Sequence, residues 1–122
     1  MVDTGLPTHS AVALANANRR GPTDTVSNLT NSWPRVSPFT SHVGGRLVYW
    51  VTFSSNRNCG VRLVGQDRLQ LWMVAVAVPD GEMPTPLMGD PSFSPFWLPF
   101  QDIATGNHIA QWTRTIVPIG FR

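Results

Sequence analysis

The chain has 122 residues, enough for one domain with a real core and too few for two. Apolar residues make up 42% of it, an ordinary fraction for a globular protein, whereas charged residues make up only 13%, about half the usual share. The 11 prolines and 10 glycines would interrupt a long helix many times. The composition therefore predicts a compact β-domain with long proline-rich connections.

The net charge of +2 comes from nine basic residues, all of them arginine. Only Arg19 and Arg20 are adjacent, and no basic stripe forms along the sequence. Nucleic-acid binding needs several charges that converge on phosphates, so we expect no nucleic-acid partner for this domain. The longest apolar run, Leu71–Val78, is far too short for a membrane span, and the first residues lack a secretory signal pattern. We expect no membrane insertion.

Residues 1–38 are rich in Thr, Ser, Asn and Pro, and we interpret them as a linker-like lead-in that packs on a β-domain formed by residues 39–122. Ser10 and Gly21 are suitable helix ends, so one short helix over Ala11–Arg19 is possible. The same segment could also be an edge strand. The two parts together make a single domain.

The stretch Arg46–Val78 carries most of the β-branched and aromatic residues and predicts two or three antiparallel strands. Gly44-Gly45 precedes the first strand, Ser55–Gly60 is typical of a hairpin loop, and Val61–Val64 reads as a short strand. We therefore expect an all-β fold, an antiparallel β-sandwich or small barrel with long Pro-rich loops. The expected core consists of Leu47, Tyr49, Val51, Phe53, Leu71, Met73, Trp112 and Ile116.

Both faces of Leu69–Val78 are apolar, so this strand needs cover on two sides, from its own chain or from another subunit. Residues 79–107 contain six prolines, which exclude a regular helix and central strands. We expect the aromatic residues of this segment to tuck back onto the sheet. Residues 108–119 then resume strand character. The aromatic residues concerned are Phe93, Phe96, Trp97 and Phe100.

Motifs for catalysis or cofactors are weak. Cys59 is the single cysteine, which excludes an intrachain disulfide, and the three histidines are too widely spaced to indicate a metal site. His9-Ser10 with Asp3 or Asp24 supplies the residue types of a catalytic triad, but no G-x-S-x-G elbow is present. The sequence therefore predicts no enzyme, no metal and no cofactor, with a small Ser/His hydrolase as one alternative.

The loops combine polar groups with aromatic residues, as carbohydrate-binding surfaces do. Sugars stack their C–H faces on aromatic rings while their hydroxyls pair with polar groups nearby. The candidate binding residues are Arg57, Asn58, Asp80, Glu82 and Trp97, all expected in surface loops. Two alternatives stay open: Trp97 could belong to the core, and Asp80 with Glu82 could hold a hard cation.

In overall character the chain resembles the protruding (spike) domain of a small positive-strand RNA virus capsid protein, of nodavirus-like or tetravirus-like type. The features that carry the resemblance are the lead-in at residues 1–38, the β-meander at Arg46–Val78, the Pro-aromatic loop at Pro79–Phe100, the scarce charge and the doubly apolar strand. The resemblance implies a virion-surface module that self-associates as a dimer or trimer and attaches to a host receptor or glycan. A stand-alone carbohydrate-binding, lectin-like module is the main alternative.

Overall fold

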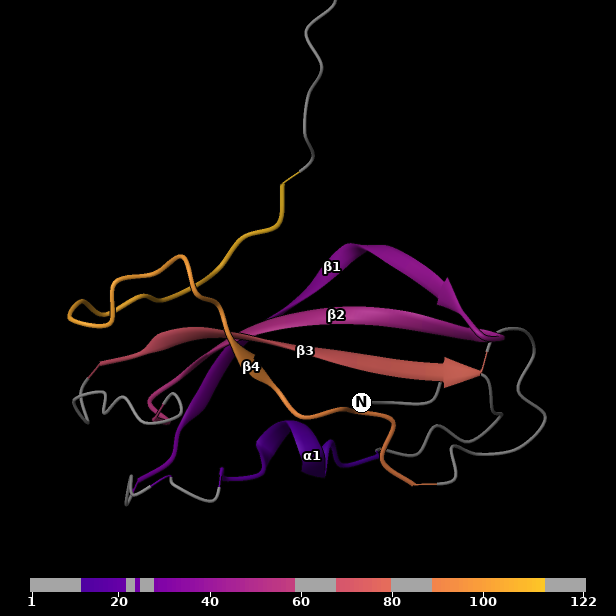
Figure 1. Ribbon diagram of the computed structural model, residues 1–122, viewed down its shortest axis with the longest axis horizontal. Coiled ribbons are helices and arrows are strands. Elements are labelled where there is room, and N and C mark those ends of the chain that lie inside the picture. Colours follow the sequence, from indigo (N-terminus) through magenta and orange to yellow (C-terminus); the bar gives the residue numbers. More distant parts are fainter. Residues whose placement is uncertain (1–11, 22–23, 25–27, 59–67, 80–88, 114–122) are drawn as a thin grey trace, which may run out of the picture.

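The computed structural model describes residues 12–21, 24, 28–58, 68–79 and 89–113. These residues form one antiparallel sheet of four strands in the order β1-β2-β3-β4, accompanied by one short helix (Figure 1). The expected antiparallel β fold is confirmed at this level. The sheet is open, and the described residues form neither a second sheet nor a closed barrel. The elements are α1 (Ala15–Asn18), β1 (Asn31–Val43), β2 (Arg46–Ser55), β3 (Gln70–Pro79) and β4 (Phe96–Trp97).

A tight hairpin joins β1 to β2. Gly44 and Gly45 both have positive φ, 55° and 73°, as the two central residues of the type I′ turn that suits twisted strands require. β1 runs through the expected boundary at residue 38. Its two prolines are the reason why the sequence of this strand resembles that of a linker. Pro34 and Pro38 lie where the β1–β2 register shifts, and β1 is an edge strand, where proline is tolerated.

The register between β2 and β3 decides which side chains share a face. Directly paired residues of antiparallel strands point to the same side of a sheet. Phe53 pairs with Trp72 and Val51 pairs with Val74, and we call this side the inner face. Leu71 and Met73 pair with Ser54 and Thr52 on the opposite side, the outer face.

The expected core therefore joined residues from two different faces, and the assignment of Leu71 and Met73 to it was wrong. Both side chains are only half-buried, as are Leu47, Tyr49, Val51 and Trp112, and Ile116 lies outside the described residues. Among the described members of the expected core, Phe53 is the buried one. The buried apolar residues of the described part are Ala17, Phe53, Trp72, Val74, Val76, Val78 and Leu98.

Helix α1 covers part of the inner face, where Leu14 and Ala17 pack with Phe53 and Val74. A four-residue helix is too short to be stable alone, and α1 has no side-chain cap of its own at Leu14. The Asp90 carboxylate supplies one from a distant segment, because its Oδ2 accepts a hydrogen bond from the Asn16 backbone N–H at 2.6 Å. The helix is shorter than the expected Ala11–Arg19.

The segment from residue 91 to residue 98 closes the free edge of β3. Backbone N–H groups donate across this edge from Ala77 to Pro91 O at 2.9 Å and from Phe93 to Ala75 O at 3.0 Å. Because the segment pairs with the edge, only part of the expected cover forms: Trp97 packs against the core cluster and Phe96 contacts Trp50, whereas Phe93 and Phe100 point to solvent. Phe93, Phe96 and Phe100 are 52%, 44% and 78% exposed, while Ser92 and Leu98 are buried instead.

Residues 107–112 cross the outer face at the Ser54 end of β2. The Ile109 backbone N–H donates to Ser54 Oγ at 3.2 Å, and Trp112 Nε1 donates to Arg35 O at 3.1 Å. Residues 108–113 are irregular, so the strand expected there is absent from them, and the positive φ of Ile109 (60°) explains why an extended chain is interrupted. Residues 114–119 and the strand expected at 61–64 lie outside the described residues.

Candidate functional site

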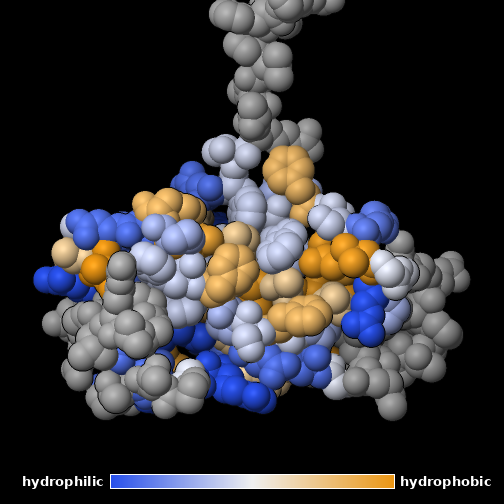
Figure 2. Space-filling model, viewed as in Figure 1, coloured by the Kyte–Doolittle hydropathy of each residue, from blue (hydrophilic) through white to orange (hydrophobic). Residues whose placement is uncertain are grey.

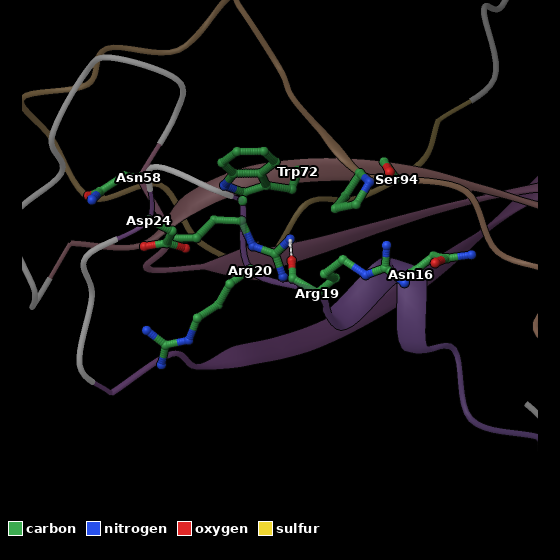
Figure 3. Close-up of a pocket in the computed structure, with 10 residues that line it drawn as sticks. Asn16, Arg19, Arg20, Asp24, Asn58, Trp72 and Ser94 are labelled. Carbon is green, nitrogen blue, oxygen red and sulfur yellow. Dashed lines mark hydrogen bonds between the residues drawn. The ribbon is translucent and has the colours of Figure 1, made fainter.

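A cavity of about 430 Å³ lies beside the end of α1, the end of β2 and the segment that leads into β4 (Figure 3). Its volume falls in the usual range of small-molecule sites. Polar and charged side chains from three chain segments meet there, together with an apolar wall. The lining residues are Asn16, Arg19, Arg20, Gly21, Asp24, Arg57, Asn58, Trp72, Ser94 and Pro95.

Arg57 follows β2 and carries its guanidinium into the interior, where the residue is only 3% exposed. Its Nη2 donates to Ala17 O at 3.2 Å, and its Nη1 donates to Arg19 O at 3.4 Å. These carbonyls stand at the C-terminal end of α1, where a helix leaves its acceptors unpaired and favours a positive charge. Nη2 also donates to Asn31 Oδ1 at 2.9 Å, and Nε donates to Ser55 Oγ at 3.0 Å.

Two aromatic rings contact the same guanidinium, those of Phe53 and Trp72, each with its centroid 5.3 Å from the central carbon. Burial lowers the pKa of Arg57 below its usual value, and the Asp24 carboxylate acts in the opposite direction. A buried cation is costly unless it is paired and hydrogen-bonded. The carbonyls, rings and carboxylate therefore make Arg57 a structural link between the sheet and α1.

The structure brings together two of the five predicted binding residues. Arg57 and Asn58 both line the cavity, but both are buried, so the expectation that they stand in an exposed loop was wrong. The reason is that α1 and the segment around Asn31 pack over the end of β2. Asp80 and Glu82 lie outside the described residues.

Trp97 does not line this cavity. Its Nε1 donates to Oε1 of the fully buried Gln70 at 3.1 Å, and its ring packs against the core cluster. Of the two roles left open for Trp97, the core contact is the one observed. Its candidate role in binding stays a prediction.

Sequence reasoning did not select the other cavity residues. Figure 3 shows the Arg19 side chain running toward Asn16, below Ser94, whereas Arg20 extends away from the other labelled side chains. The adjacent arginines were the signal available in the sequence. This signal alone could not predict a cavity, because a pair of charged residues at a helix end is usually solvated.

Trp72 contributes an unusual donor to the cavity wall. Among the described residues its indole Nε1 is buried and has no hydrogen-bond partner, and the residue is only 7% exposed. Buried donors are nearly always paired, so such a group calls for an explanation. In Figure 3 the ring nitrogen lies on the side of Asp24 and Asn58, at the end of the cavity opposite Arg19.

The outer face is a second candidate surface. The rings of Trp50 on β2 and Phe96 on β4 meet edge to face there, with centroids 6.5 Å apart. Ala75 pairs with Trp50, and Met73 pairs with Phe96, so the small Ala75 leaves room for the rings to approach. Figure 2 shows apolar side chains gathered over the middle of the sheet, with hydrophilic residues around them.

The described part of the chain shows no candidate metal-binding cluster. No group of three or more His, Cys, Asp or Glu side chains that could hold a metal ion occurs there. His9 and Ser10, the residues of the hydrolase alternative, lie outside the described residues. None of the described helices has the length and apolarity needed to cross a membrane.

Comparisons with protein-family models, with curated proteins and with solved structures found no match for this chain.

Proposed function

We propose that this chain is a structural and interaction module that pairs with a second copy of itself through the outer face of the sheet. The observation that carries the proposal is the apolar, half-exposed surface around Trp50, Ala75 and Phe96, which the rest of the described chain leaves open. Exposed apolar patches of this kind usually mark interaction sites.

The chemistry of this face supports a second copy as the partner. On β2, β3 and β4 the charged side chain of this face is Arg46, at the very start of β2, so the middle of the face offers nothing to a phosphate backbone or to an acidic or basic peptide. A surface whose middle is apolar and uncharged is best matched by an equal surface, which a two-fold axis provides. Its residues on these strands are Arg46, Val48, Trp50, Thr52, Ser54, Leu71, Met73, Ala75, Ala77, Pro79 and Phe96.

Two such sheets packed face to face would form the β-sandwich that the sequence predicts, with its second layer supplied by the partner. The 10 residues of β2, the 10 of β3 and the 2 of β4, spaced at about 4.8 Å with a rise of about 3.3 Å per residue, give a flat area of roughly 350 Å², part of which residues 107–112 already cover at the Ser54 end. A standard interface buries about 800 Å² on each partner. Side-chain relief adds to the flat area, so we expect a reversible dimer with a dissociation constant of about a micromolar or weaker.

The biological setting that we propose is the one implied by the resemblance, a protruding domain on the surface of a small RNA virus capsid. Self-association holds such domains together in pairs, and the loops away from the interface are then available for attachment to a host receptor. The lectin-like alternative has less support, because Trp97, its stacking residue, contacts Gln70 and does not line the cavity with Arg57.

A matched pair of substitutions tests the self-association. Phe96→Ser removes an exposed ring from the outer face, and Phe100→Ser removes an even more exposed ring that follows β4. In sedimentation velocity over a concentration series, we expect Phe96→Ser to weaken dimerisation about tenfold or more and Phe100→Ser to leave it unchanged. Equal dimerisation by both variants would show that the outer face is not the interface.

A further inference from the structure

We propose that the cavity beside α1 is a binding site for a small organic oxyanion, a carboxylate or phosphate whose body carries hydroxyl groups, and that Arg19 contacts the oxyanion. The proposal does not rest on self-association, because the cavity lies by the covered, inner side of the sheet, where Trp72 is buried.

The charge balance of the lining favours an anion. Three arginines, Arg19, Arg20 and Arg57, line the cavity together with one carboxylate, that of Asp24. Guanidinium groups pair with carboxylates and phosphates through two parallel hydrogen bonds, which gives both affinity and orientation. A neutral or cationic ligand would gain nothing from this excess of positive charge.

The three arginines have different roles. The hydrogen bonds of Arg57 go to Ala17, Arg19, Asn31 and Ser55, so it contributes charge from a fixed position. Arg20 extends away from the other labelled side chains (Figure 3). Arg19 is exposed and runs along the cavity toward Asn16, below Ser94, so it is the guanidinium best placed to contact an incoming oxyanion.

The opposite end of the cavity favours a ligand that is larger than a bare ion. The unpaired Trp72 N–H lies toward Asp24 and Asn58, and water does not reach it. A hydroxyl oxygen of a ligand that displaces the shielding side chains would accept this hydrogen bond. Pro95 and the Trp72 indole supply apolar surface between the two ends. The site thus combines a cationic end at Arg19, an apolar wall, and a distant polar end with the Trp72 donor and the Asp24 carboxylate.

The test is a titration of ¹⁵N-labelled protein followed by NMR, with sodium glucuronate, glucose and inorganic phosphate as separate probes in a phosphate-free buffer of low ionic strength. We expect saturable shifts of amides around Arg19, Asn58 and Ser94 and of the Trp72 indole N–H with glucuronate, and none with glucose. Saturation by inorganic phosphate with the same amide shifts would identify a free phosphate as a sufficient ligand. Binding of glucuronate alone would identify the acidic sugar.

Variants of Arg19 and Arg46 complete the test. Arg19→Gln should weaken glucuronate or phosphate binding about tenfold or more, and Arg19→Lys should have a smaller effect, because lysine keeps the charge but loses the planar fork. Arg46→Gln removes an exposed arginine from the start of β2 and should change nothing. Equal affinity in Arg19→Gln and the unmodified chain, equal binding of glucose, or no saturable shift with any probe would overturn the proposal.

The experiments on the dimer and on the oxyanion site test the two proposals independently. A strict monomer that still binds glucuronate would remove the proposed self-association and leave the oxyanion site intact. A dimer that binds none of the probes would remove the oxyanion site and leave the proposed self-association intact.

Discussion

The guanidinium carbon of Arg57 lies 5.3 Å from the centroid of the Trp72 ring, and the same group donates to two backbone carbonyls at the end of α1. One side chain thus joins β2, β3 and the only helix of the described chain. Arginine suits this place because a flat, delocalised cation can stack on a ring and donate in its own plane at the same time.

Arg57→Lys should therefore destabilise the domain by about 3 kcal/mol or more, since an ammonium group cannot reach the same acceptors and leaves a poorly paired buried charge. Urea unfolding followed by far-UV circular dichroism measures the free energy of unfolding. The matched control is Arg46→Lys, an exposed arginine at the start of β2, which should change stability by less than about 0.5 kcal/mol. Similar losses in the two variants would contradict the structural role of Arg57.

The assignment of faces predicts different losses of stability when two apolar residues of β3 are each replaced with alanine. Val74 is 2% exposed on the inner face, whereas Leu71 is half-buried on the outer face. Val74→Ala should cost about 2–3 kcal/mol, and Leu71→Ala should cost less although it removes more carbon atoms. Chemical denaturation of both variants measures the difference. A larger loss from Leu71→Ala would mean that the faces are assigned the wrong way round.

The carboxylate of Asp90 links α1 to the segment that closes the β3 edge. Burial acts to raise the pKa of Asp90, but hydrogen bonds from the Ser92 hydroxyl and from the backbone of Asn16, Ser92 and Ala15 hold it below its ordinary value. A lowered folded-state pKa contributes stability above the unfolded value of about 4, and this contribution is lost as the pH falls through the folded value.

Asp90→Ala should accordingly lower the free energy of unfolding at pH 7 by about 1 kcal/mol, the usual cost of replacing a helix-capping side chain with alanine. The deficit should shrink as the pH is lowered from 5 to 3, because the unmodified chain then loses its own charge-dependent contribution. Urea unfolding at several pH values measures both curves. A deficit that stays constant down to pH 3 would argue against an ionised Asp90 as the cap.

The strands of the central stretch could be predicted from the sequence, because Leu47, Val51 and Phe53 alternate strictly with a period of two. The residues that pair with them on the neighbouring strands could not be predicted from the sequence. Residues on both faces of β3 are apolar, so its pattern is compatible with either register, and a shift of one residue exchanges the two faces. This is why Leu71 and Met73 were placed in the core and Trp72 and Val74 were not.

The candidate site was harder to predict, because its residues come together only through tertiary contacts. Arg57 and Asn58 stand beside Asn56 in a stretch rich in turn formers, which indicates a loop. Their burial depends on carbonyls of Ala17 and Arg19, 40 and 38 residues away in the chain. β1 was missed for a related reason, since Pro34 and Pro38 lower strand propensity but are tolerated on an edge strand.

The most direct test of the proposed self-association is the solution mass of the unmodified chain, measured by sedimentation equilibrium from low micromolar to millimolar concentration. We predict a weight-average mass that rises from the monomer value of 13.4 kDa toward twice that value as concentration increases. A mass that stays at 13.4 kDa over the whole range would contradict pairing through the outer face.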